Sequence, residues 1–324
     1  MRNSYSLSMI IPAYGSPEEL KSLLNSIKAH GSPAIEVWVI DDGSDPPLEE
    51  VVKQFNFNYH YQENRGPCAA RNQGAKLANA KTFFFLDSDT ELLPDTLPKA
   101  LELIKKPDFN IVSIIYHPES LSKGFVPEYK CLFDFYSYFN CPEGPVPELA
   151  GQSCLFRKDV FLDIGGWDEN FNRPDMEHEE FSNRIKKKYT INLFHGIYVK
   201  HHFPKMKKLL VSLFHRSMSW TRLKINGKVK FDGFHRTRST AMAIFLPFLS
   251  ILSLIGSIFN PLFTAIFLIL IFLFFLANLT FFKFLFNRTS LFSGIIFIGI
   301  HFLVQFSVSL GALFGLLTFW KAKW

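Results

Sequence analysis

The division of charge along the chain is the feature that most constrains how this sequence can fold. Residues 1–199 contain 20 basic and 28 acidic side chains, residues 200–238 contain 11 basic side chains and one acid, and residues 239–324 contain four basic side chains and no acid. The last stretch also holds about half of the 37 phenylalanines. This order is typical of a globular domain that meets anionic lipid through a basic juxtamembrane segment. The net charge of +6 is therefore no sign of a nucleic-acid partner.

Three apolar stretches after Ser239 are each long enough to cross a hydrocarbon layer of ~30 Å as a helix. They are residues 240–259, 262–282 and 295–317. The positive-inside rule places the cations that flank the first two stretches in the cytoplasm. These cations are Arg236, Arg238, Lys283 and Arg288. Three spans would leave Lys321 and Lys323 outside, so two spans or a re-entrant third segment stay open. We expect a multi-pass protein of the cell membrane with a cytoplasmic globular domain.

The basic strip carries apolar residues at helical spacing, with cations at other positions. The apolar positions are Met206, Leu209, Leu210, Leu213, Trp220 and Leu223, and the cations include Lys205, Lys207, Lys208, Arg216 and Arg222. Residues 204–238 are therefore expected to form an amphipathic segment in the membrane interface. An ordinary domain helix with a solvated basic face is the alternative.

The N-terminal part, residues 1–203, alternates short apolar runs with helical stretches. The runs are residues 9–14, 36–42, 57–62, 82–89 and 110–116, and the helical stretches include 18–28, 47–55 and 68–80. Strand, helix and strand in this order predict an α/β domain with a mostly parallel sheet flanked by helices. Ligands of such a sheet bind at the carboxyl ends of its strands.

Pairs of acids end two of these runs, Asp41 with Asp42 and Asp87 with Asp89. Carboxylates at positions i and i+2 can share one hard cation, and Mg²⁺ or Mn²⁺ bound in this way completes its shell with substrate phosphates. An acidic loop without a metal is the alternative. No glycine-rich phosphate loop follows any run, so the sequence indicates a metal diphosphate rather than a dinucleotide.

Taken in order, these motifs resemble glycosyltransferase family 2, whose members are inverting enzymes with the GT-A nucleotide-diphospho-sugar transferase fold. The resemblance runs through most of residues 6–203. The matching segments are MIIPAY with Gly15, VIDDGS, ENRGPCAARNQGA, FFFLDSDTELLPD and GQSCLFRKDVFLDIGGWDENF. The resemblance implies transfer from a nucleotide sugar, with a UDP-sugar as the expected donor and Mg²⁺ or Mn²⁺ as the cofactor.

The resemblance also implies roles for particular residues. Asp42 would contact the base or ribose of the donor, Asp89 would bind the metal, and Asp87 would lie beside the ribose and the metal. Arg71 and Asn72 would brace the diphosphate, although a structural ion pair is an alternative role for Arg71. The remaining donor-side residues are Pro12, Tyr14 and Ser88. The acceptor-side residues are Gln152, Gly166, Trp167 and Arg184.

Residues 176–184 stand where the family has the helix start E-D-x-[DE]-[LF]-x-x-R, but His178 replaces the second acid. An inverting enzyme needs a base that removes the proton of the acceptor hydroxyl. We expect Glu177 to be that base, with His178 as the alternative. Glu180 is expected to orient Arg184. A solvated acidic helix start, favoured by the helix dipole, is the non-catalytic alternative.

His201 resembles the histidine of the family's closing V-x-H motif, which can complete the metal shell. The Q-x-x-R-W signature of processive synthases is absent, so transfer of a single sugar is favoured over polymer synthesis. Because the basic strip begins at His201 without a linker, we expect a lipid-linked acceptor in cell-envelope glycan synthesis. The alternatives are transfer to a polyprenyl phosphate and a non-catalytic membrane protein that binds nucleotide sugars.

Overall fold

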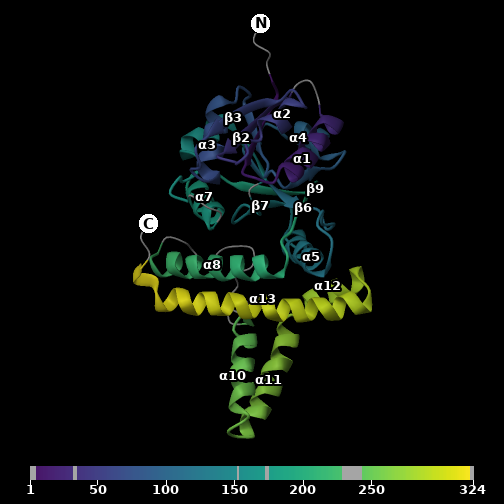
Figure 1. The fold of residues 1–324 in the computed structure, drawn as a ribbon, viewed down its shortest axis with the longest axis vertical. Coiled ribbons are helices and arrows are strands. Elements are labelled where there is room, and N and C mark those ends of the chain that lie inside the picture. The colour runs from purple at the N-terminus through teal and green to yellow at the C-terminus, as the bar shows by residue number, and fades with distance from the viewer. Residues whose placement is uncertain (1–4, 32–34, 152, 172–174, 228–242, 322–324) are drawn as a thin grey trace. The chain divides into compact units, whose positions relative to one another are not determined.

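The computed structural model describes residues 5–31, 35–151, 153–171, 175–227 and 243–321 (Figure 1). The chain divides into two compact units, one formed by residues 1–121 with 138–202 and the other by residues 122–137 with 203–324. The second unit thus includes residues 122–137, which the sequence analysis assigned to the globular domain. The last part of the predicted basic segment, residues 228–238, lies outside the described residues, together with residues 240–242 of the first predicted span.

The first unit alternates strands and helices. Its strands are β1 (Leu7–Ala13), β2 (Ile35–Asp42), β3 (Asn58–Gln62), β4 (Thr82–Phe85), β5 (Thr90–Leu92), β6 (Ile111–Tyr116), β7 (Gly144–Val146), β8 (Cys154–Arg157) and β9 (Ile191–His201). Its helices are α1 (Pro17–His30), α2 (Glu49–Lys53), α3 (Pro67–Leu77), α4 (Thr96–Leu103), α6 (Lys158–Ile164) and α7 (Glu177–Ile185). The predicted α/β fold is confirmed.

Among the described residues, nine strands form one sheet in the order β3-β2-β1-β4-β8-β6-β9-β5, with β7 also paired to β9. The β1, β2, β3 and β4 strands are mutually parallel, whereas β8 is antiparallel to β4 and β6. In the parallel register Ala13 lies opposite Asp41. The carboxyl ends of β1, β2 and β4 therefore share one edge of the sheet, where ligands bind in open α/β sheets.

Helix α3 lies close against the sheet because Gly74 has no side chain. A Cβ atom added at Gly74 would lie 2.4 Å from Cγ2 of Ile10 and 3.2 Å from Cγ1 of Ile40. The helix follows Gly66, whose φ of 91° lies in the left-handed region, and Pro67 occupies the first turn, where its missing N–H has no helical partner to lose. This packing carries Arg71 to the carboxyl edge of the sheet.

Aromatic packing fixes the segments behind that edge. The ring of Phe85, at the end of β4, lies 5.1 Å from Phe161 of α6 and 6.3 Å from Trp167. Trp167 in turn packs at 4.3 Å on Phe181 of α7. Such contacts contribute ~0.5–1.5 kcal/mol per pair beyond their buried area. One apolar cluster thus holds together strand β4, the turn after α6 and helix α7.

The second unit is helical. Its helices are α5 (Phe125–Phe139, whose last two residues fall in the first unit), α8 (Met206–Ile225), α10 (Leu246–Gly256), α11 (Leu262–Ala277), α12 (Leu279–Arg288), α13 (Leu291–Leu317) and the 3₁₀ turn η1 (Phe319–Lys321). Tyr129 and Leu132 of α5 are buried in one core with Phe281, Leu285 and Phe297. The chain therefore leaves the sheet after β6, contributes α5 to the helical unit, and returns.

Helices α8 and α13 approach each other through small residues. A Cβ atom added at Gly311 would lie 2.2 Å from the carbonyl oxygen of Phe214, and one added at Gly315 would lie 2.6 Å from that of Met218. Four residues before Gly311, the hydroxyl of Ser307 donates to the carbonyl of Leu210 at 2.8 Å. Small residues every fourth position let helix backbones pack closely. The amphipathic helix expected from the basic strip is thus joined along its length to the most C-terminal long helix.

A buried polar network lies where α11 meets α12, at a bend of 62°. His301 Nε2 lies 2.9 Å from Oδ1 of Asn278, the residue between the two helices, and His301 Nδ1 lies 2.7 Å from the hydroxyl of Tyr129. Gln305 also donates to Asn278 Oδ1. Because buried polar groups without partners are costly, this network stabilises the bend and ties α5 and α13 to it.

The three predicted spans correspond only in part to the helices. Among the described residues, α13 is the one helix long and apolar enough to cross a membrane by itself, the bent pair α11–α12 counts as a second if taken together, and α10 is shorter. The described helices therefore do not support three crossings.

Candidate active site

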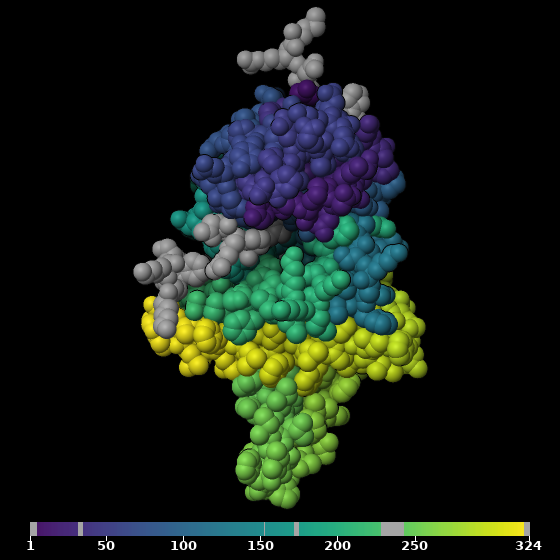
Figure 2. All heavy atoms as spheres, in the orientation of Figure 1, coloured from purple at the N-terminus to yellow at the C-terminus, as the bar shows by residue number. Residues whose placement is uncertain are grey.

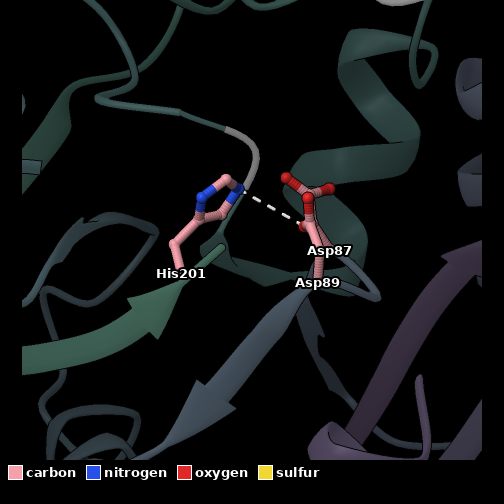
Figure 3. Close-up of side chains that lie close together, drawn as sticks. All are labelled: Asp87, Asp89 and His201. Atoms are coloured by element: carbon pink, nitrogen blue, oxygen red, sulfur yellow. Dashed lines mark ion pairs between the residues drawn. The ribbon is translucent and has the colours of Figure 1, made fainter. Parts of the chain in front are cut away.

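Asp87, Asp89 and His201 form a cluster at the carboxyl edge of the sheet (Figure 3). The two acids lie in the turn between β4 and β5, and His201 ends β9. Because Thr90 of β5 lies opposite His201 in the antiparallel ladder, Asp89 Oδ1 comes within 3.3 Å of His201 Nε2. One ligand atom of each of the three side chains lies within 4.8 Å of the others.

The two acids of the cluster have different pKa values because their neighbours differ. Burial raises the pKa of Asp87 above its ordinary value, and the nearby Arg71 offsets only part of this effect. Burial also acts to raise the pKa of Asp89, but His201, by charge and hydrogen bonding, outweighs it and the net pKa is lowered. Asp89 is therefore the more readily ionised of the pair.

The donor set of this cluster fits a divalent cation. Two carboxylates and one imidazole suit Mn²⁺ well and Mg²⁺ less well, because imidazole is a softer ligand than oxygen. Three protein ligands leave coordination positions for the oxygens of a substrate diphosphate. Asp87, Asp89 and His201 are the residues that would hold the ion.

Arg71 is buried beside the cluster with part of its hydrogen-bonding capacity unused. Its Nη2 donates to Asp87 Oδ1 at 2.8 Å, and its guanidinium lies 5.0 Å from the centre of the Trp167 ring. Its Nε and Nη1 groups are buried and have no hydrogen-bond partner among the described residues. Unsatisfied buried donors of this kind cost free energy, which a bound anion would recover. The ion pair with Asp87 and a ligand contact are thus compatible.

Asn72 joins α3 to the segment after α6. Its side-chain nitrogen donates to the carbonyl of Trp167 and to Glu169, both at 2.9 Å, and its side-chain oxygen accepts from the Trp167 N–H. Gly166 allows this approach, because a Cβ atom there would lie 2.7 Å from the Asn72 oxygen, and its φ of 71° favours glycine. These hydrogen bonds give Asn72 a structural role, and its contact with a diphosphate stays a prediction.

Asp41 and Asp42 organise the loops at the edge of the sheet. Asp41 accepts hydrogen bonds from the backbone N–H groups of Ser44 and Leu48. Asp42 accepts from the backbone N–H groups of Arg65 and Gly66, at 2.9 and 2.8 Å. Asp42 therefore fixes the loop that starts α3, and its contact with a nucleotide stays a prediction.

The acidic cluster lies on the first turn of α7, where Glu177, His178 and Glu179 are buried and Glu180 is half-buried. Glu177 is 1% exposed, and its carboxylate accepts the backbone N–H of Asp175 at 2.7 Å. Nδ1 of His178 lies 3.0 Å from Glu179. Glu180 binds Arg184 through two hydrogen bonds of 2.7 and 2.9 Å, and Arg184 also donates to the carbonyl of Gly166. Glu180 and Arg184 thus brace the Gly166–Trp167 turn, whereas Glu177 and His178 stay candidates for the base.

The remaining predicted residues differ in their surroundings. Pro12 is buried inside β1, Tyr14 is 64% exposed just after it, and Ser88 is half-buried between the two acids of the cluster. Gln152 lies outside the described residues.

Two residues of this region were not predicted from the sequence. Glu179 is buried beside His178, although the family motif places no requirement on its position. The ring of Tyr116, at the end of β6, packs 4.5 Å from that of His201. The sequence could have indicated Glu179, because a carboxylate directly follows His178. It could not have indicated Tyr116, whose contact with His201 results from the pairing of β6 with β9.

The comparisons with known proteins agree with this geometry. Residues 8–165 match the family described as glycosyl transferase family 2. This part of the chain is a family 2 glycosyltransferase domain. The matched region includes Asp42, Arg71 and the Asp87–Asp89 pair, and it ends before the acidic helix and His201.

Relatives of this glycosyltransferase domain occur in bacteria. The chain is 24% identical over 181 residues to a poly-beta-1,6-N-acetyl-D-glucosamine synthase of Staphylococcus epidermidis, covering 52% of this chain and 44% of that protein. It is 32% identical over 181 residues to an uncharacterized glycosyltransferase of Haemophilus influenzae, covering 49% and 55%. The chain thus spans about half the length of the curated relatives it matches.

A similar fold is found in the mannosyltransferase PcManGT of Pyrobaculum calidifontis, solved in complex with GDP-Man and Mn²⁺. The TM-score is 0.58 at 14% identity, and the similarity covers 99% of this chain and 88% of the other. This likeness supports the GT-A fold of the family 2 domain.

Proposed function

We propose that this protein is an inverting glycosyltransferase that moves one sugar from a nucleotide sugar, with a UDP-sugar as the expected donor, to a lipid-linked acceptor in cell-envelope glycan synthesis. The observation that carries the proposal is the placement of Asp87, Asp89 and His201 beside the buried Arg71. A divalent cation and an arginine with unused donors are complementary to a diphosphate leaving group. The similarity to a polysaccharide synthase and to a mannosyltransferase supports the reaction class.

The proposed cofactor is Mn²⁺ or Mg²⁺, held by Asp87, Asp89 and His201. When bound, the ion would offset negative charge on the departing nucleotide diphosphate. Arg71 would orient the diphosphate through Nε and Nη1, while its Nη2 stays on Asp87. Trp167, packed on the guanidinium, holds that orientation.

Glu177 is the proposed base. Its carboxylate would accept the proton of the acceptor hydroxyl as that oxygen attacks the anomeric carbon from the face opposite the diphosphate. The backbone N–H of Asp175 donates to this carboxylate at 2.7 Å and would help to hold it in place. His178, held against Glu179, is the second candidate for the same role.

A lipid-linked acceptor is proposed from the order of elements along the chain. Strand β9 ends at His201, and the basic helix α8 begins at Met206, so only residues 202–205 separate them. Cations near an anionic lipid surface contribute ~1 kcal/mol each. We propose that the second unit holds the protein on the cell membrane, with the family 2 domain on the cytoplasmic side.

A polyprenyl phosphate is the second candidate acceptor, because His178 stands where the family motif has an acid. A phosphate oxygen is already anionic and needs no base, and a histidine repels it less than a carboxylate would. Under this alternative Glu177→Gln would leave the transfer rate nearly unchanged.

The proposal is tested with the purified full chain in nanodiscs. Nucleotide sugars are first screened for protection against thermal unfolding in the presence of Mn²⁺, because a ligand that binds the folded state raises the midpoint. The best donor, radiolabelled, is then incubated with a lipid extract from envelope membranes. We expect label in the lipid fraction with inverted anomeric configuration. Donor protection without any transfer to lipid, sugar or protein acceptors would instead identify a non-catalytic binding protein.

A further inference from the structure

Among the described residues, α13 is the one single helix that is long and apolar enough to span a membrane. Its packing against α8 prevents it from crossing alone. From Ser307 to Thr318 it packs side by side with α8, which runs in the same direction, so that Leu210, Phe214, Met218 and Arg222 follow one another along it. Arg222 donates to the hydroxyl of Thr318 at 2.7 Å. Any crossing by α13 would therefore carry α8 into the bilayer with it.

Helix α8 cannot be accommodated in hydrocarbon. It contains Lys207, Lys208, Arg216, Arg222 and Lys224, and both adjacent lysines near its start are exposed. A cation at the centre of a membrane span is strongly unfavourable. The same residues are favourable in a layer of anionic headgroups. The α8–α13 pair therefore fits the membrane interface, with both helices parallel to the surface.

The helices α10 and α11 have the opposite character. They form a hairpin that projects away from α8 and α13 within the second unit (Figures 1 and 2). Residues 246–277 contain no charged side chain, and most of their large apolar side chains are exposed. At the turn, Ile258 is 79% exposed, Phe259 is 83% exposed and Leu262 is 63% exposed. An apolar surface of this extent, if it were exposed to water, would drive aggregation.

The backbone N–H groups at the turn of the hairpin are paired within the turn. The backbone N–H groups of residues 257–260 donate to carbonyls of α10, and those of residues 263 and 264 donate to the carbonyls of Asn260 and Pro261. The N–H of Leu262 donates to the Asn260 side chain at 2.9 Å, and Pro261 has no N–H. A turn that emerges into water does not need such pairing, whereas one that stays in hydrocarbon does.

The hairpin is also short. The 16 residues of α11 extend ~24 Å at 1.5 Å per residue, less than the ~30 Å of a hydrocarbon core. We propose that the α10–α11 hairpin enters the hydrocarbon from the cytoplasmic face and ends inside it, while α8 and α13 lie in the headgroup layer of that same face. The protein is thereby monotopic and no segment from Leu246 to Lys321 crosses the membrane. This inference rests on the membrane association proposed above, but not on the enzymatic activity.

The test uses single cysteines in the full chain, in a Cys141→Ser background because the other native cysteines are buried. Phe259→Cys and Ile258→Cys report the turn, Asn287→Cys and Trp320→Cys report the two ends of the α13 region, and Lys207→Cys reports α8. Spheroplasts and inverted membrane vesicles are treated with a membrane-impermeant maleimide. Detergent-solubilised samples show that each cysteine can react.

We expect Lys207→Cys, Asn287→Cys and Trp320→Cys to be labelled only in inverted vesicles, and the two turn variants to be labelled only after detergent. Labelling of the turn in spheroplasts would overturn the proposal in favour of a crossing hairpin. Labelling of positions 287 and 320 from opposite faces would restore α13 as a span. Disulfide-linked dimers of Phe259→Cys formed in membranes under mild oxidant would show that a second copy, rather than lipid, covers the turn. All of these readouts are independent of glycosyl transfer.

Discussion

Arg71 and Asp87 form a buried ion pair, with Nη2 2.8 Å from Oδ1, that joins helix α3 to the turn between β4 and β5. Arg71 lowers the pKa of Asp87 against the opposing effect of burial, which still leaves that pKa above the ordinary value. The proposed role of Asp87 as an anionic metal ligand thus depends on Arg71, the residue that we propose to orient the diphosphate.

Replacing Arg71 by methionine should move the acid limb of the pH–activity profile to higher pH. Without the guanidinium the pKa of Asp87 rises further, so protonation of that carboxyl disables metal binding at a pH where the wild-type protein is still active. The loss of diphosphate contacts should also lower kcat/KM by about 10² at the pH optimum. Arg157→Met, which alters an exposed arginine paired with Asp159, serves as the matched control and should leave the profile in place. An unchanged acid limb in Arg71→Met would contradict the coupling.

The choice between Glu177 and His178 as the base can be made by paired variants. For a hydroxyl acceptor, Glu177→Gln should lower turnover by about 10² to 10⁴ while donor binding, measured by calorimetry, is unchanged. His178→Ala should cost much less, because it removes only the partner of Glu179. The reverse pattern would assign the base to the histidine.

The α8–α13 packing can be tested by two glycines of the same helix. Gly311→Leu should destabilise the second unit by ~1–3 kcal/mol or more, since its Cβ would lie 2.2 Å from the Phe214 carbonyl. Gly299→Leu is the control, because nothing lies within 4 Å of a Cβ at that position. The measurement is the thermal midpoint in detergent together with protease cleavage within α8. Equal stability of the two variants would rule out the close packing.

Glu36 gives the first unit a pH-dependent stability. It is 4% exposed, and although burial raises its pKa, hydrogen bonds from the Asn79 backbone, Ser8 and the Asn79 side chain outweigh burial and lower it. A lowered pKa stabilises the folded state above the ordinary value of 4.5, and this stabilisation is lost as the pH falls through the folded-state pKa.

Glu36→Gln should therefore cost ~1–3 kcal/mol of unfolding free energy at pH 7 and progressively less as the pH falls below 4.5. Glu102→Gln, at an exposed position on α4, is the control and should show no such trend. Denaturant unfolding at several pH values provides the measurement. A cost that stays constant with pH would exclude ionisation of Glu36 as its source.

Much of the first unit was predictable because local pattern and fold agree there. The runs that became β1, β2, β4 and β6 are almost wholly buried strands, and the acid pairs follow strands whose carboxyl ends share an edge. The antiparallel β8 and the pairing of β5 with β9 were not predicted, since short strands give a weak periodic signal. That pairing brings Asp89 close to His201. The sequence indicated this proximity only through the family resemblance.

The second unit was less predictable because hydropathy shows that a segment is apolar but does not show whether lipid or another helix covers it. Residues 295–317 read as a span, yet Ser307, Gly311 and Gly315 are covered by α8. The break at Asn278 was missed because the stabilising partners, Tyr129 and His301, come from distant parts of the chain. Likewise, nothing in the sequence of α5 indicated that Tyr129 and Leu132 belong to the helical core.

We propose that Asp87, Asp89 and His201 hold a divalent cation that the transfer reaction requires. The most direct test is nucleotide-diphosphate affinity and sugar transfer measured against Mn²⁺ concentration for wild type, Asp89→Asn and His201→Ala, with Asp108→Asn as an exposed control. We predict that chelator abolishes both nucleotide-diphosphate binding and sugar transfer in the wild type. Asp89→Asn should transfer no sugar at any Mn²⁺ concentration, and His201→Ala should need at least about tenfold more Mn²⁺ than wild type for half-maximal transfer. Full transfer by wild type in excess chelator, or by Asp89→Asn, would show that the reaction does not depend on a cation at this site.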